Sequence, residues 1–243
     1  MITYPEDSDG KLYLIPTRLG EDIAVEVLPI SVKKVIERVD HFIVENEKSA
    51  RRFIKKINPR KVQSKLNIHT INKYTDIMEL PSFLQPCIEG IPVGLLSEAG
   101  CPGIADPGAE VVRLAHEKGI PVVPLVGPSS ILLAMMSSGM NGQSFTFHGY
   151  LPIERSERKA SLKKLERQSL EYHQAQIFIE TPYRNNKMIE DLTATLHPQT
   201  RLCIACDITL TTEYIKTKRI EQWKKEQLDL HKRPTIFIVQ KDI

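Results

Sequence analysis

The sequence predicts an α/β protein of two lobes, each built on a mostly parallel sheet. Short apolar runs alternate along the chain with amphipathic segments, which is typical of strands that alternate with helices. The composition, 41% hydrophobic and 26% charged residues, is that of a globular protein. The 243 residues suit two domains of about 100–150 residues better than one. About ten predicted strands divide naturally into two sheets.

In the first half, apolar runs between turn residues predict strands, and apolar residues at helical spacing predict helices. The predicted strands are Lys11–Thr17, His41–Glu45, Leu66–Ile71, Val93–Ser97 and Pro121–Val126. The predicted helices are Glu21–Val39 (broken), Ser49–Ile57, Asp76–Glu89 (interrupted at Pro81), Gly108–Lys118 and Ser130–Ser138. Asp106 and Pro107 suit the N-cap and first-turn positions of the helix that follows them.

The second half continues this alternation. The predicted strands are Phe145–Tyr150, Gln176–Glu180, Arg201–Thr209, Glu213–Lys216 and Thr235–Gln240. The predicted helices are Glu154–Ser169, Asn185–Leu196 and Glu221–Leu228. The domain boundary is expected near Val126–Pro128, where a strand ends in Gly-Pro-Ser-Ser. We therefore expect an N-terminal α/β domain over residues 1–126 and a C-terminal α/β domain over residues 127–243.

Membrane and metal-dependent classes find no support in the sequence. The longest apolar run lies within Ile131–Met136, far below the ~20 residues of a membrane span. The first ten residues are acidic and contain no apolar core, so we expect no signal peptide and a cytoplasmic protein. Cys203 and Cys206 lie three apart on a predicted strand, where their side chains point to opposite faces. We therefore expect buried thiols and no metal site.

One segment is strongly basic although the net charge is only +3. Lys48–Lys65 holds eight basic residues and no acidic residue. At helical spacing, the apolar residues of this segment face a core, and its cations share the opposite face. Those cations are Arg51, Arg52, Lys55 and Lys56. A solvated helix face would explain them, and RNA phosphates are their natural partner.

The loops after the predicted strands are the candidate ligand sites, because open α/β sheets bind ligands beyond the carboxyl ends of their strands. Neither GxGxxG nor GxxxxGK[ST] occurs there. The most distinctive loop is Ser97–Gly108, whose three glycines and two prolines fix an irregular backbone open to a ligand. Gly127–Ser130 opens a helix with two hydroxyl groups, and Glu180–Arg184 follows another strand with an acid, an aromatic and a base.

Six segments in order carry a family resemblance. They are LYLIPTRLG (12–20), LLSEAGCPGIADPG (95–108), PVVPLVGPSS (121–130), FTFHGYLP (145–152), IFIETPYR (177–184) and PTIFIVQ (234–240). This set resembles the tetrapyrrole methylase superfamily, the class III S-adenosylmethionine-dependent methyltransferases. Within it, the chain is most similar to the ribosomal RNA small subunit methyltransferase I family, which 2′-O-methylates a cytidine of 16S rRNA.

The resemblance implies two α/β lobes with S-adenosylmethionine in a cleft between them, in a homodimer that acts on rRNA or the small ribosomal subunit. By position, it implies these cofactor contacts: Pro16, Ser97, Glu98, Ala99, Gly100, Ile104, Ser129, Ser130, Ile179, Ala205 and Thr235. A ribose hydroxyl is weakly acidic, so a general base would help the transfer. The candidates are Glu180, which we favour as nearest to the expected cleft, Glu45 and Asp106.

Two alternatives remain open at this point. A tetrapyrrole or protein methyltransferase of the same superfamily would keep the cofactor and change the acceptor. A non-catalytic RNA-binding relative would bind RNA without transferring a methyl group. The replacement of basic residues around Cys206–Leu210 motivates this alternative.

Overall fold

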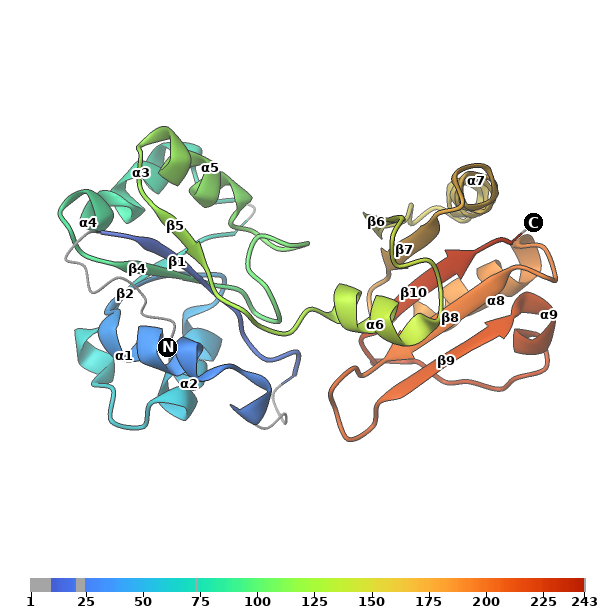
Figure 1. The fold of residues 1–243 in the computed structure, drawn as a ribbon, viewed down its shortest axis with the longest axis horizontal. Helices are drawn as coiled ribbons and strands as arrows, with labels where there is room; N and C mark the ends of the chain where they lie inside the picture. Colours follow the sequence, from blue (N-terminus) through green and yellow to red (C-terminus); the bar gives the residue numbers. More distant parts are fainter. Residues whose placement is uncertain (1–9, 21–24, 73, 243) are drawn as a thin grey trace. The chain divides into compact units, whose positions relative to one another are not determined.

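The computed structural model describes residues 10–20, 25–72 and 74–242. The predicted features of the first nine residues and the start of the predicted helix Glu21–Val39 lie outside these residues. The chain divides into two compact units, Met1–Ser129 and Ser130–Ile243, and each is described by itself. Each unit holds one five-stranded sheet with helices around it, so the predicted α/β class is confirmed (Figure 1).

The sheet of the first unit is parallel throughout, in the order β3-β2-β4-β1-β5. Its strands are β1 (Leu12–Ile15), β2 (His41–Val44), β3 (Asn67–Thr70), β4 (Val93–Leu96) and β5 (Val122–Pro124). Its helices are α1 (Ile30–Arg38), α2 (Glu47–Ile57), α3 (Leu80–Phe83), α4 (Gln85–Ile88) and α5 (Ala109–Glu117), with short 3₁₀ turns η1 (Val25–Val27), η2 (Gln63–Lys65) and η3 (Ile77–Glu79).

Two apolar cores cover the two faces of this sheet. Phe42 and Val44 of β2 pack into the core that α1 and α2 complete, and Ile43 points into the core of α3, α4 and α5. This alternation follows from the two-residue period of a strand. It also explains why β2 reads as a continuous apolar run, because helices cover both of its faces (Figure 1).

The sheet of the second unit is mixed, in the order β6-β7-β10-β8-β9. Its strands are β6 (Phe145–Tyr150), β7 (Ala175–Ile179), β8 (Arg201–Cys206), β9 (Tyr214–Arg219) and β10 (Thr235–Gln240). Only β6 and β7 pair in parallel, whereas β7-β10, β10-β8 and β8-β9 are antiparallel. The predicted parallel arrangement therefore describes the first sheet and only one pair of the second. The short connection between β8 and β9 is typical of an antiparallel pair, whereas the place of β10 between β7 and β8 cannot be read from the order of the strands along the chain.

Four helices accompany the second sheet: α6 (Ser130–Ser138), α7 (Arg155–Tyr172), α8 (Asn185–Thr195) and α9 (Ile220–Trp223). Leu162 of α7 and Leu192 of α8 share a core with Phe178 and Phe237 of the strands. α6 packs against β8, β9 and β10. The predicted helix Glu221–Leu228 is wrong in length, since α9 ends at Trp223, and Asp76–Glu89 is divided into η3, α3 and α4.

A buried ion pair joins α7 to α8. The Asp191 carboxylate lies 2.5 Å from Arg158 Nη2 and 3.0 Å from Arg155 Nε. The Asp191 and Arg158 side chains are 0% and 3% exposed, whereas that of Arg155 is 58% exposed. Burial opposes the Asp191 charge, and the two guanidinium groups outweigh it and lower the pKa of Asp191.

We expect Asp191→Ala to lower the free energy of unfolding by about 3 kcal/mol, because it leaves the Arg158 charge buried and unpaired. Arg155→Ala is the matched control and should cost less than about 1 kcal/mol, since Arg155 reaches the same carboxylate from solvent. Denaturant unfolding of the full chain measures both. Equal losses in the two variants would contradict the role of burial.

Candidate functional site

Three loops meet at the carboxyl edge of the first sheet. The parallel strands β1, β4 and β5 end at this edge, so the loops that follow them emerge side by side. Thr17 N donates to Gly100 O at 2.8 Å, and Ser97 Oγ donates to the same carbonyl at 3.0 Å. Cys101 Sγ lies 3.4 Å from Pro128 O. These bonds tie the three predicted contact loops of this unit together.

Two glycines allow this close approach. Gly100 has φ +78°, and a Cβ there would lie 3.1 Å from Leu19 Cδ2 and 3.3 Å from Pro128 O. A Cβ on Gly127 would lie only 2.2 Å from Pro16 Cβ and Cγ. Any side chain at either position would push the loops apart. The backbone is therefore the surface that this edge offers to a ligand.

The structure brings some of the predicted contact residues of this unit together and spreads others. Pro16, Ser97 and Gly100 are buried at the point where the loops meet. Glu98, Ala99 and Ile104 are exposed beside them. Asp106 does not cap the next helix, so that prediction is wrong. Gly108 takes the N-cap position with φ +128°, which turns the chain between Asp106 and the first turn of α5.

Three carboxyl groups, Glu45 after β2 and Glu98 and Asp106 in the loop after β4, lie close together. Glu98 N donates to Glu45 Oε1 at 3.1 Å, and Ser49 Oγ donates to Glu98 Oε1 at 2.5 Å. Burial and, next, the charge of Asp106 raise the pKa of Glu45 to about 7, against the opposing bond from Glu98 N. Burial and the charge of Glu98 raise the pKa of Asp106. Glu45 can therefore exchange a proton near neutral pH.

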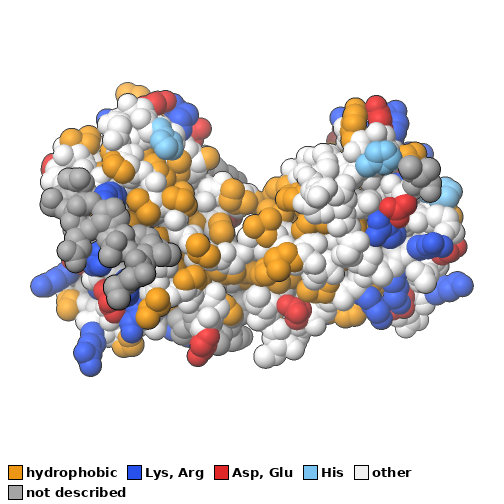
Figure 2. Space-filling model, in the orientation of Figure 1, with side chains coloured by type: hydrophobic (Ala, Val, Ile, Leu, Met, Phe, Trp, Pro, Cys, Tyr) orange, Lys and Arg blue, Asp and Glu red, His pale blue; other side chains and the backbone are white. Residues whose placement is uncertain are grey.

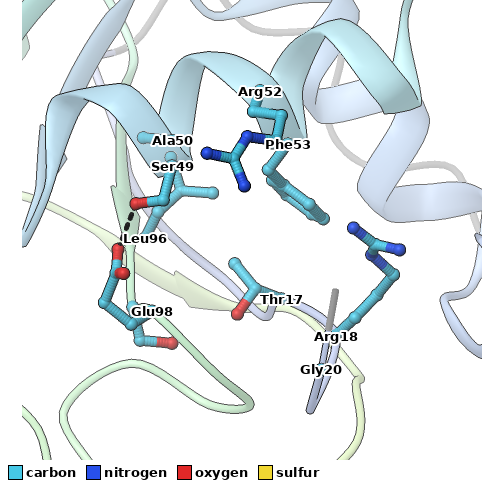
Figure 3. Close-up of a pocket in the computed structure, with 10 residues that line it drawn as sticks. Thr17, Arg18, Gly20, Ser49, Ala50, Arg52, Phe53, Leu96 and Glu98 are labelled. Atoms are coloured by element: carbon cyan, nitrogen blue, oxygen red, sulfur yellow. Dashed lines mark hydrogen bonds between the residues drawn. The ribbon is translucent and has the colours of Figure 1, made fainter. Parts of the chain in front are cut away.

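A cavity of about 140 Å³ opens between the loop after β1, helix α2 and the loop after β4. Figure 3 shows Arg18 and Arg52 entering from one side and Glu98, with its bond from Ser49, on the other. Phe53 and Leu96 contribute apolar surface. Thr17 is only 5% exposed, and its Oγ1 has no hydrogen-bond partner among the described residues. Thr17 and Arg18 belong to the first loop, where only Pro16 was predicted as a contact.

The predicted basic face lies on α2, and its members differ in their surroundings. Asn46 caps the helix by accepting from Lys48 N and Ser49 N, at 3.0 and 3.2 Å. Arg51 bonds Glu47 and the Gln63 carbonyl, both at 2.7 Å. Lys55 Nζ donates to Pro59 O at 2.7 Å, Lys56 is exposed, and Arg52 lines the cavity. Basic side chains project from the part of the first unit that holds α1 and α2 (Figure 2).

In the second unit, three predicted contacts lie at neighbouring strand positions. Ile236 of β10 pairs with Ile179 of β7 and with Ala205 of β8, and Thr235 precedes it. Asn185 Nδ2 donates to Thr235 Oγ1 at 3.3 Å. Ser130 begins α6, and Ser129 ends the first unit.

Glu180 occupies a different environment from Glu45. It is 4% exposed, and its Oε1 accepts from Arg184 Nη2 and Thr181 N, each at 2.6 Å. Glu180 is therefore fixed by an arginine, whereas Glu45 lies beside two other carboxyl groups. The sequence analysis missed Asn185, which is fully buried and whose Oδ1 has no partner within the described ranges. Asparagine at the start of a helix reads as a cap, so the sequence offers no signal for it.

Residues 10–20, 25–72 and 74–242 contain no group of three or more His, Cys, Asp or Glu side chains that could hold a metal ion. The thiols of Cys203 and Cys206 are buried and free. Among the same residues, no helix is both long and apolar enough to span a membrane.

Comparison with known proteins gives one family. The sequence profile of the tetrapyrrole (corrin/porphyrin) methylases matches residues 12–223. Ribosomal RNA small subunit methyltransferase I of Escherichia coli O157:H7 is 28% identical over 97% of this chain and 79% of that protein. The corresponding protein of Neisseria meningitidis serogroup B is 30% identical over 84% of this chain and 66% of its own length.

Solved structures share the fold. The methyltransferase CobJ superposes with a TM-score of 0.63 at 15% identity, over 96% of this chain and 95% of that one. Uroporphyrin-III C-methyltransferase from Thermus thermophilus, complexed with S-adenyl homocysteine, superposes with a TM-score of 0.57 at 15% identity. The superposition covers 96% of this chain and 98% of that one.

We expect the free energy of unfolding to fall as pH rises from about 4.5 to about 7, because the folded state holds the Glu45 proton over this window and the unfolded state does not. Glu45→Gln should remove this part of the slope. Asp106→Asn should lower the Glu45 pKa, which carboxyl NMR resolves directly. Titration of Glu45 near 4.5 in the native chain would contradict the assignment.

Proposed function

The chain belongs to the tetrapyrrole (corrin/porphyrin) methylase family and is an S-adenosylmethionine-dependent methyltransferase, and we propose that its acceptor is a ribose 2′-hydroxyl of 16S rRNA. The alignment with the rRNA methyltransferase of Escherichia coli carries this proposal, because it extends over 97% of the chain. The solved structures of uroporphyrin-III and cobalt-precorrin-4 methyltransferases are at most 18% identical to this chain, so they support the fold alone. The relatives are named as methyltransferases, which weighs against the non-catalytic alternative.

S-adenosylmethionine supplies an electrophilic methyl group when bound. The loops that meet at Gly100 and Gly127 suit such a ligand, because they present backbone that no side chain screens. We assign the contacts to the residues that the resemblance implies. They are Pro16, Ser97, Glu98, Ala99, Gly100, Ile104 and Ser129 in the first unit, and Ser130, Ile179, Ala205 and Thr235 in the second. The position of this ligand between the two lobes stays a prediction.

Glu45 is the base that this proposal favours. The Glu45 carboxylate would take the proton of the ribose hydroxyl while its oxygen bonds to the methyl group, the methyl carbon–sulfur bond breaks and S-adenosylhomocysteine leaves. A pKa of about 7 suits a group that must accept a proton near neutral pH. Asp106 acts as a positioning residue, because its charge helps to raise that pKa. Glu180 is less suited, since Arg184 holds its carboxylate.

The remaining parts of the proposal concern partners. The cations of α2 suit RNA phosphates. The homodimer that the resemblance implies stays a prediction. An enzyme that acts on rRNA or the small ribosomal subunit would work in the cytoplasm.

The proposal is tested with radiolabelled S-adenosylmethionine and ribosomal subunits from cells that lack this protein. We expect label in 16S rRNA of the small subunit, at one position that resists alkaline cleavage. Large subunits and naked rRNA are the parallel acceptors. Label in no RNA, with cofactor binding intact by calorimetry, would contradict the proposal and favour a tetrapyrrole or protein acceptor.

We expect kcat of the unmodified enzyme to rise as pH increases through about 7, because only the ionised Glu45 accepts the proton. Glu45→Gln should lower kcat by about 100-fold and abolish this dependence. Asp106→Asn should move the midpoint to lower pH, since it removes one charge that raises the Glu45 pKa. An unchanged pH profile of kcat in Glu45→Gln would exclude Glu45 as the base and favour Glu180.

A further inference from the structure

The cavity beside α2 brings together Thr17, Arg18 and Arg52, none of which is a proposed cofactor contact or base. We propose that it is a phosphodiester subsite, which holds one backbone phosphate of the RNA acceptor between Arg18 and Arg52. This inference rests on the proposed function and names two recognition residues, Thr17 and Arg18, outside the predicted basic face. The cavity lies within the first unit and needs no contribution from the second.

The two arginines reach the cavity from segments far apart in the sequence. Arg18 follows β1, and Arg52 lies in the middle of α2. Both residues line the cavity, and in Figure 3 the Phe53 ring stands between their guanidinium groups. Arg18 is only 9% exposed, so its side chain is held by the fold rather than extended into solvent. A planar guanidinium group can donate two parallel hydrogen bonds to the oxygens of one phosphate, and two arginines line this cavity.

Thr17 provides a second, independent observation. Its hydroxyl is buried and Oγ1 lacks a hydrogen-bond partner in the described part of the chain, although the residue lines the cavity. A buried hydroxyl without a partner costs about 1–3 kcal/mol. A phosphate oxygen in the cavity would accept this hydrogen bond and remove the cost. The Thr17 backbone is already fixed by its bond to Gly100 O at 2.8 Å, so the hydroxyl is in place before a ligand arrives.

The opposite wall of the cavity fits the sugar side of a nucleotide. Glu98 lies there, and Ser49 Oγ donates to its Oε1 at 2.5 Å. The backbone N of Glu98 bonds Glu45 Oε1 at 3.1 Å, so the proposed base adjoins this wall. A phosphate on the arginine side would therefore place the attached ribose toward Glu45. Positioning of this kind is the main contribution that a protein can make to transfer from an already activated donor.

The test measures the binding of a diribonucleotide with one phosphodiester and of its uncharged methylphosphonate counterpart, by calorimetry with the full chain. We expect the native protein to prefer the phosphodiester by at least about tenfold, and Arg52→Gln to reduce this preference to less than about threefold. Arg18→Lys should also weaken the preference, because an ammonium group lacks the planar pair of donors. Arg113→Gln is the matched control, since Arg113 is an exposed arginine on α5 that pairs with Glu110 and Glu117.

Thr17→Val separates recognition from folding. It removes a hydroxyl that has no partner in the described ranges, so thermal stability should be unchanged or higher while the phosphodiester preference falls about threefold or more. An equal preference in the native protein and all variants would overturn the subsite. Weaker S-adenosylmethionine binding in Arg52→Gln would overturn it too, by assigning the cavity to the cofactor. The rRNA methylation assay judges the proposed function separately, because it does not depend on these variants.

Discussion

The close approach of three backbone segments at Gly100 and Gly127 is the constraint on which the candidate site depends. The Thr17 N–H bond to Gly100 O and the contact of Gly127 with Pro16 hold together the loops after β1, β4 and β5. Parallel pairing brings the three strand ends to one edge, and the glycines then allow the loops to touch. Everything assigned to the first unit is arranged around this junction, including the carboxyl cluster and the cavity beside α2.

Electrostatics divides the acidic residues of the chain into two kinds. Asp191 and Glu180 are buried with a guanidinium partner, and their charges belong to the framework of the second unit. Glu45, Glu98 and Asp106 are instead held near one another, and burial together with repulsion between these carboxyl groups raises the pKa values of Glu45 and Asp106. Burial and repulsion of this kind cost stability and raise the pKa of Glu45 to about 7, a kind of shift that is often found at functional sites.

The two units have different sheets, one parallel and one mixed, although strands and helices alternate in both halves of the sequence. In the first, apolar cores lie on both faces of the central strands β1, β2 and β4, as is typical of a parallel sheet. In the second, the run of β8, β9 and β10 with only the short α9 between them permits antiparallel neighbours. The fold is shared with solved methyltransferases at 13–18% identity, which shows that this pairing scheme tolerates extensive change of side chains.

The sequence by itself determined the class of fold, the order of strands and helices, and the family. Apolar periodicity is a local property, so α2 and its buried residues Ala50, Phe53, Ile54 and Ile57 could be predicted from spacing. Tertiary structure alone decided the mixed second sheet, the pairing of Glu180 with Arg184, and the cavity shared by Arg18 and Arg52. Those features join residues distant in the chain or depend on burial, and a pKa is set by whatever surrounds the group in space. Glu45, Glu98 and Asp106 illustrate the difference: their loops were recognisable from residue types, and their mutual repulsion appeared only when the chain was folded.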